Sequence, residues 1–173
     1  RLGRMGGTVA HAAVDLTRTV FHTMEGRSAA ILGRGTMSGL AATQMRRAGV
    51  ARLVAVNRTA ESAAQFAGRV HAEPRVIAPD LEFLDDVDVL LCCSRAPYQH
   101  LTAEAVESAM RRRGGRMLLV IDISVPRGVD PAVGELENVL LYNIDDLQTM
   151  TEGETDGHAA GAGRLRTEDL DHA

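Results

Sequence analysis

A glycine-rich segment early in the chain has the residue types and spacing of a phosphate-binding turn. Residues 33–38 read Gly-Arg-Gly-Thr-Met-Ser and fit the pattern G-x-G-x-x-small. Gly33 permits a tight turn, Gly35 lets the backbone approach a pyrophosphate, and Ser38 allows close helix packing. The phosphates would lie at the N-terminus of the next helix, where free N–H groups favour negative charge. The alternative is a turn that only connects strand to helix. The expected dinucleotide contacts are Gly33, Arg34, Gly35, Thr36, Met37 and Ser38.

The residues at the end of the next strand indicate which dinucleotide is bound. Sites for NAD usually carry an acid there, about 20 residues beyond the glycines, to hold the ribose 2′-hydroxyl. This chain has Asn57, Arg58 and Thr59 instead. A guanidinium and a hydroxyl can bind a 2′-phosphate through charge-assisted hydrogen bonds, so the sequence favours NADP. Alternatively, Arg58 is a surface residue and Thr59 only the N-cap of a helix.

Polar residues also follow two later strands. Ser94, Ala96 and Pro97 come after the fourth strand, and we expect them near the adenosine ribose or the nicotinamide half of the cofactor. The fifth strand ends in the segment 122–127, which holds an acid, a serine and an arginine that either face the nicotinamide or substrate or form a rigid turn. These residues are Asp122, Ser124 and Arg127.

Several reactive residues are expected to be structural. Cys92 and Cys93 lie in an apolar strand on opposite faces, so we predict neither a disulfide nor a catalytic thiol. The six histidines show no metal-ligand spacing with the cysteines, so no metal site is expected. Asp145 and Asp146 fit the start of a helix, and the run Arg111–Arg113 fits a solvated helix end.

The elements that position these residues alternate between strand and helix. Periodicity and turn residues predict helices at 8–24, 37–48, 60–70 and 102–113, and strands at 28–32, 52–56, near 76, 87–92, 117–123 and 139–142. This alternation predicts a Rossmann-like α/β fold, a doubly wound, mainly parallel sheet with helices on both faces and strand order 3-2-1-4-5-6.

Composition shifts divide the chain into three parts. We expect a leading helix and linker over residues 1–26, an NADP-binding Rossmann domain over 27–150, and a flexible tail over 151–173, where apolar periodicity is absent. The chain starts with Arg1 rather than Met, which indicates a fragment.

Bulk composition excludes several classes of protein. Of the 173 residues, 45% are hydrophobic and 24% charged, as in ordinary globular domains. A net charge of −4 and 3% aromatic residues argue against a basic or aromatic nucleic-acid surface. No apolar stretch approaches the ~20 residues that span a bilayer. With free cysteines and no visible signal peptide, a cytoplasmic location without membrane partners is expected.

Taken together, these segments resemble the glutamyl-tRNA reductase family, which makes glutamate-1-semialdehyde for tetrapyrrole (haem) biosynthesis. The likeness is nearly continuous from residue 9 to 148, and the order of VNRT, IDISVPR and LYNIDDL is more specific than the glycine turn. It is carried by 9–16 (VAHAAVDL), 31–40 (ILGRGTMSGL), 56–59 (VNRT), 94–102 (SRAPYQHLT), 121–131 (IDISVPRGVDP) and 141–147 (LYNIDDL).

The resemblance implies an oxidoreductase in which NADPH on this domain reduces the glutamyl group of glutamyl-tRNA. The family's cysteine nucleophile lies in an N-terminal catalytic domain that receives the tRNA, and a C-terminal helical domain allows a homodimer. Neither is present here, so no residue of this chain is expected to be catalytic, and NADPH should bind without turnover. Two features depart from the family: Arg34 replaces a small residue, and 151–173 does not resemble the usual long helix.

Two alternatives remain. The chain could belong to another NADP-dependent oxidoreductase of the shikimate-dehydrogenase type, which shares the Asn-Arg-Thr feature, or it could be a non-catalytic Rossmann scaffold that binds a regulatory partner.

Overall fold

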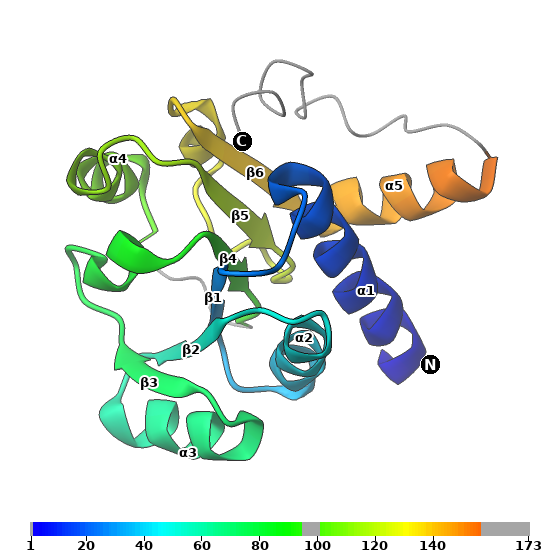
Figure 1. Ribbon diagram of the computed structural model, residues 1–173, viewed down its shortest axis with the longest axis horizontal. Coiled ribbons are helices and arrows are strands. Elements are labelled where there is room, and N and C mark those ends of the chain that lie inside the picture. The colour runs from blue at the N-terminus through cyan, green and yellow to red at the C-terminus, as the bar shows by residue number, and fades with distance from the viewer. Residues whose placement is uncertain (1, 95–100, 157–173) are drawn as a thin grey trace.

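The computed structural model describes residues 2–94 and 101–156. Six strands form one sheet in which all neighbouring strands are parallel, in the order β3-β2-β1-β4-β5-β6 (Figure 1). This is the predicted strand order, which reverses between β1 and β4. The strands are β1 (Ser28–Leu32), β2 (Arg52–Asn57), β3 (Glu73–Val76), β4 (Val89–Cys92), β5 (Leu118–Asp122) and β6 (Val139–Asn143).

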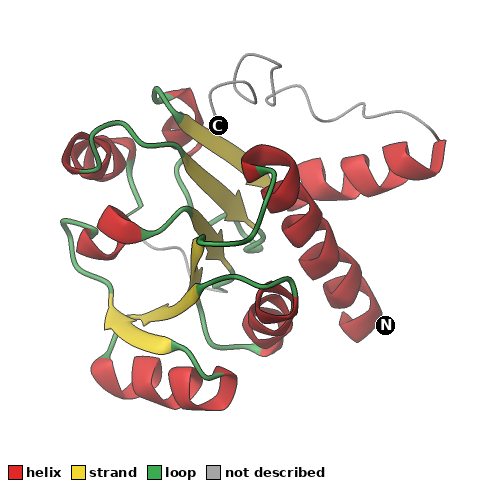
Figure 2. Cartoon of the chain, viewed as in Figure 1, coloured by secondary structure: helices red, strands yellow, loops and turns green. Residues whose placement is uncertain are grey.

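Helices connect the strands and cover both faces of the sheet, as Figure 2 shows. The observed helix over 60–70 has the predicted bounds, and the other predicted helices begin or end within a few residues of them, except that the first begins at residue 2 rather than 8. The helices are α1 (Leu2–Phe21), α2 (Thr36–Arg47), α3 (Ala60–Val70), α4 (Ala103–Arg112) and α5 (Ile144–Asp156), with two short 3-10 helices, η1 (Glu82–Asp86) and η2 (Pro131–Glu135). Neither 3-10 helix was predicted, because one turn has no periodicity to detect.

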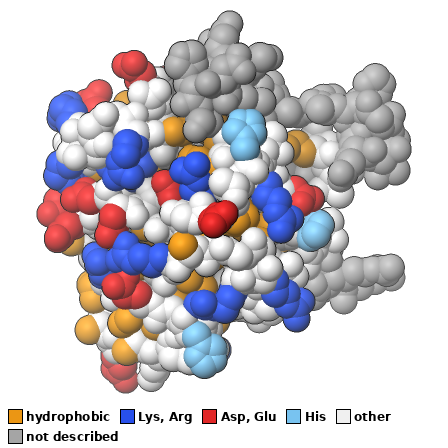
Figure 3. All heavy atoms as spheres, in the orientation of Figure 1, with side chains coloured by type: hydrophobic (Ala, Val, Ile, Leu, Met, Phe, Trp, Pro, Cys, Tyr) orange, Lys and Arg blue, Asp and Glu red, His pale blue; other side chains and the backbone are white. Residues whose placement is uncertain are grey.

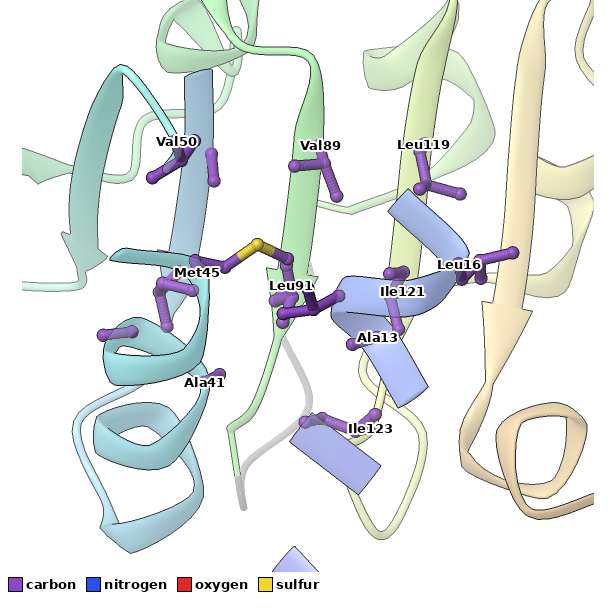
Figure 4. Close-up of a cluster of buried hydrophobic side chains, with 14 of the residues drawn as sticks. Ala13, Leu16, Ala41, Met45, Val50, Val89, Leu91, Leu119, Ile121 and Ile123 are labelled. Atoms are coloured by element: carbon purple, nitrogen blue, oxygen red, sulfur yellow. The ribbon is translucent and has the colours of Figure 1, made fainter. Parts of the chain in front are cut away.

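The sheet separates two apolar cores. One core contains buried side chains of α1 and α2 together with alternate strand residues such as Leu91 and Ile121, which Figure 4 shows pointing toward these helices. The other core joins the remaining strand residues, Leu90 and Val120 among them, to η1, α4 and η2. Because both faces are covered, the central strands are mainly apolar, and all five residues of β5, including Asp122 at its end, are buried.

The two ends of the described chain pack on the same side of the sheet. Ala13 and Leu16 of α1 are fully buried, so α1 is part of the core. Helix α5 contacts α1 and continues past the domain end expected at residue 150. It begins with a reciprocal cap in which Asn143 N–H donates to the Asp146 carboxylate and Asp146 N–H donates to the Asn143 side-chain oxygen, each at 2.9 Å. The predicted helix start with early acids is therefore confirmed.

The arginine run at the C-terminal end of α4 differs from the prediction. Arg111 and Arg112 are exposed, but Arg113 is buried and donates hydrogen bonds to the carbonyls of Leu84 (2.6 Å) and Met117 (2.7 Å). Burial lowers the pKa of Arg113 to about 10, with the positive charge of Arg116 adding to the effect. The prediction of a solvated helix end is wrong for Arg113, because its side chain folds back to satisfy carbonyls around η1.

The surface carries interspersed charges over the described part of the face in Figure 3. Arg52 pairs with Glu73 and Asp86, and Arg112 pairs with Asp85. Among the described helices, none is both long enough and apolar enough to cross a bilayer.

Candidate functional site

The glycine turn between β1 and α2 has a backbone that only glycine fits. Gly33 has φ +135°, and a Cβ there would lie 2.6 Å from the Ser38 hydroxyl oxygen and 3.1 Å from the Cys93 carbonyl. Ser38 is buried, which gives the small residue the packing role predicted for it. The tight turn is therefore dictated by contact between β1, α2 and the end of β4.

The N-terminus of α2 is open toward solvent. Gly35 is the N-cap, no side chain caps the first turn, and a Cβ on Gly35 would meet nothing within 4 Å. The uncapped N–H groups and the positive end of the helix dipole can therefore be reached by an anion from outside. This is the geometry that a pyrophosphate requires.

A groove of about 1300 Å³ runs past this helix end. It exceeds the roughly 300–1000 Å³ of pockets for drug-sized ligands, as an extended dinucleotide requires. All six predicted residues of the turn except the buried Ser38 line it, as do the three at the end of β2. The lining residues are Val9, Gly33, Arg34, Gly35, Thr36, Met37, Asn57, Arg58, Thr59, Ser62, Gln65, Phe66, Arg69, Cys93, Ser94, Ile123, Ser124, Val125 and Ile144.

The three residues at the end of β2, Asn57 to Thr59, have different local roles. Asn57 is buried, and its side-chain amide donates to the Gly33 carbonyl at 3.2 Å, so it also fixes the glycine turn. Thr59 is the N-cap of α3 and accepts from Ser62 N–H at 3.1 Å, while it still lines the groove. Arg58 is exposed at the groove between them.

One end of the groove is basic. Arg34, Arg58 and Arg69 line it, and no aspartate or glutamate is among the described lining residues. Sequence reasoning missed Arg69, Ser62 and Gln65, although 62, 65, 66 and 69 fall on one face of a helix and could have been found once α3 was placed beside the glycine turn. The basic end thus combines two segments that are distant in sequence.

The other end of the groove is mainly apolar, with Val9, Met37, Ile123, Val125 and Ile144 as its lining. Val125 is 69% exposed, so a large apolar side chain stands at the mouth. Ser94 also lines the groove, while Ala96 and Pro97 lie outside the described residues. Such surroundings suit an uncharged or delocalised ring.

The segment after β5 mainly builds the turn. Asp122 is buried, and its carboxylate accepts N–H bonds from Ser124 (3.1 Å), Gly128 (2.9 Å) and Val129 (2.9 Å). Arg127 pairs with Asp145 at 3.4 Å away from the groove lining. Of the polar residues left open by the sequence, only Ser124 faces the groove.

The adjacent cysteines are unsuited to nucleophilic chemistry. They lie against opposite cores, with Cys92 buried and Cys93 partly buried. Burial, and next the charge of Asp122, raises the pKa of Cys92 to about 12. Burial, and next Cys92, raises the pKa of the Cys93 thiol as well. Neither thiol ionises near neutral pH. In the described part of the chain, no three His, Cys, Asp or Glu side chains are grouped to hold a metal.

Sequence comparison shows which known proteins this chain is similar to. A family model described as shikimate / quinate 5-dehydrogenase matches residues 15–150. The chain is 36% identical over 172 residues to a glutamyl-tRNA reductase of Solibacter usitatus, covering 99% of this chain and 39% of that protein. It is 39% identical over 141 residues to one of Bacillus pumilus, covering 82% and 31%. The chain thus spans less than half of these curated relatives.

Solved structures give the same result for the fold. The glutamyl-tRNA reductase of Methanopyrus kandleri superposes with a TM-score of 0.77 at 26% identity, covering 95% of this chain and 42% of that one. The nucleotide-binding domain of the Thermoplasma volcanium glutamyl-tRNA reductase gives 0.64 at 14% identity, covering 86% and 94%. The second likeness concerns fold alone.

Proposed function

Because the chain belongs to the family described as shikimate / quinate 5-dehydrogenase, and its curated relatives there are glutamyl-tRNA reductases, we propose that it is the NADPH-binding domain of a glutamyl-tRNA reductase. The observation that carries this proposal is the groove that joins an uncapped helix N-terminus to an arginine-lined end. The domain limits 27–150, the cytoplasmic location and the homodimer stay predictions.

The choice of NADP over NAD rests on charge. A carboxylate at the end of β2 would repel a 2′-phosphate, and the described groove lining contains none. Arg58 can donate two parallel hydrogen bonds to a phosphate, and Thr59 adds a hydroxyl. The residues present therefore fit the phosphorylated ribose better than the free one.

Each part of the chain has a defined task in the proposed reaction. Backbone N–H groups of the first turn of α2 would bind the pyrophosphate, and the apolar end of the groove would shield the nicotinamide from water. When bound, NADPH would supply the hydride that reduces the activated glutamyl group of glutamyl-tRNA. We expect the thioester-forming thiol to come from another domain, because burial raises the pKa of both Cys92 and Cys93.

A titration with an Arg58 variant tests the proposal. NADPH binding to the unaltered chain should be measurable by calorimetry, and Arg58→Ala should weaken it by at least about tenfold, since a charge-assisted hydrogen bond contributes about 1.5–3 kcal/mol. Arg47→Ala, which removes an exposed arginine outside the groove lining, is the matched control and should change nothing.

The same titration decides against the proposal if no dinucleotide binds, which would favour a scaffold that binds a partner. Oxidation of shikimate by the chain alone would instead favour the shikimate-dehydrogenase type. We expect binding of NADPH without turnover, because hydride donor and acceptor must be held in contact and the family resemblance assigns the acceptor to a separate catalytic domain.

A further inference from the structure

The glycine turn and α3 are connected by reciprocal hydrogen bonds at the basic end of the groove. The Arg34 guanidinium donates to the Ser62 hydroxyl at 3.2 Å, and the Arg69 guanidinium donates back to the Arg34 carbonyl at 2.9 Å. Arg69 is also held over the ring of buried Phe66, with 5.4 Å from the guanidinium carbon to the ring centroid. Both cations are thus oriented by groups on α3.

These two arginines differ from several other arginines on the surface. Arg52 and Arg112 pair with carboxylates, as does Arg127. Within residues 2–94 and 101–156, Arg34 and Arg69 contact only a hydroxyl, a carbonyl and an aromatic ring, all neutral. Two cations without a counter-charge in one groove create a positive potential that an anionic ligand would neutralise.

The direction of the Arg34 side chain identifies which anion. The pyrophosphate would lie at the N-terminus of α2, where Gly35 leaves open space. The Arg34 side chain instead reaches Ser62 in the first turn of α3, next to the end of β2, where a Rossmann domain holds the adenosine ribose. A guanidinium has five N–H donors, and its bond to Ser62 occupies only one of them.

We infer that Arg34 is a specificity-determining residue that binds the 2′-phosphate of NADP together with Arg58, and that Arg69 positions it. The inference rests on the proposed function and adds to it a second phosphate ligand from the glycine turn itself. Ser62 holds the Arg34 guanidinium, and Arg69 holds the Arg34 backbone. Arg34 thereby adds a second positive charge for the 2′-phosphate, because the end of β2 supplies only one arginine, Arg58.

The test compares ligands that differ only by the 2′-phosphate. Dissociation constants are measured for NADPH and NADH, and for adenosine 2′,5′-bisphosphate and adenosine 5′-monophosphate, with the unaltered chain and with Arg34→Ala, Arg34→Lys, Arg69→Met and Arg47→Ala. Arg34→Ala should reduce the NADPH preference on the order of tenfold, with NADH affinity changed less than about twofold. Arg34→Lys should keep part of the preference, because it keeps the charge without the planar fork.

The outcomes separate this inference from the proposed function. If the unaltered chain prefers NADPH and Arg58→Ala removes the preference while Arg34→Ala leaves it intact, Arg34 has no role in specificity and the proposed function stands. If Arg34→Ala weakens the binding of NADPH and NADH equally, Arg34 contacts the pyrophosphate and the inference is wrong. If the unaltered chain does not distinguish the two, both the NADP proposal and this inference fail. Arg69→Met should weaken the preference less than Arg34→Ala, and a larger effect would contradict its positioning role.

Discussion

At the scale of single residues, side chains that could contact a ligand often also stabilise the backbone turns of the groove through hydrogen bonds. Asn57 was predicted as a cofactor contact, and it lines the groove, but its amide is already committed to the Gly33 carbonyl. Asp122 has the chemistry of a catalytic acid, yet its carboxylate is saturated by three backbone N–H groups. Residue type and spacing predicted the candidate site, whereas hydrogen-bond partners were needed to show which of its residues also stabilise the turns.

The buried Cys92 thiol predicts how the stability of the fold depends on pH. The ordinary pKa of Cys92 is 9.0, and burial raises it to about 12. The folded state therefore retains a proton that the unfolded state loses, so the thiol's contribution to stability is complete below about pH 9 and is lost as the pH rises toward 12. Chemical unfolding between pH 8 and 11 should show this decline, and Cys92→Ala should show a smaller one.

Alkylation provides an independent check on the same thiols. Iodoacetamide at pH 8 should leave both cysteines of the native chain unmodified and label both in denaturant. Rapid labelling of the native chain would show that a thiolate is accessible and would contradict the inert role assigned to them.

At the scale of elements, the strength of the sequence pattern decided what could be predicted. The mainly apolar strands β1 and β5 were evident, because a doubly covered sheet leaves a strong local signal. The N-cap role considered for Thr59 was also evident, because an N-cap residue is a local signal. The 3-10 helix η1 was missed, and so was the burial of Arg113 beneath it, because tertiary hydrogen bonds to carbonyls leave no mark in a sequence. Likewise, Arg69 belongs to the groove only because α3 lies beside the glycine turn.

Substitutions at two threonine N-caps distinguish an effect on stability from an effect on cofactor binding. Thr59 and Thr102 each accept an N–H bond at the start of a helix, from Ser62 and Ala105 respectively. Replacing either by alanine should reduce the free energy of unfolding by about 1 kcal/mol. Of these two variants, only Thr59→Ala should also weaken the binding of NADPH, because Thr59 lines the groove and Thr102 does not. Loss of affinity in Thr102→Ala would argue against the assigned boundaries of the site.

At the scale of the whole molecule, α1 joins the core rather than preceding it. Leu16 is 1% exposed and lies in the core between α1 and the sheet (Figure 4). The predicted topology was confirmed because alternating strands and helices admit few arrangements. The extent of α1 and α5 was less predictable, because the first residues of α1 and the last residues of α5 carry weak apolar periodicity.

Substitution in α1 tests its place in the core. Leu16→Ala should lower the free energy of unfolding by about 2–5 kcal/mol, as for other buried leucines. Thr19→Ala changes an exposed residue of the same helix and should have an effect within about 0.5 kcal/mol. Equal, small effects in both variants would mean that α1 is dispensable for the Rossmann core.

The central claim is that this groove holds NADPH through its 2′-phosphate, and the ratio of the NADH and NADPH dissociation constants of the unaltered chain tests it most directly. Both constants should be measured by calorimetry at one moderate salt concentration, since salt screens the arginines. We expect NADPH to bind at least about tenfold more tightly, the difference that one charge-assisted contact provides. Equal affinities, or tighter binding of NADH, would contradict the account.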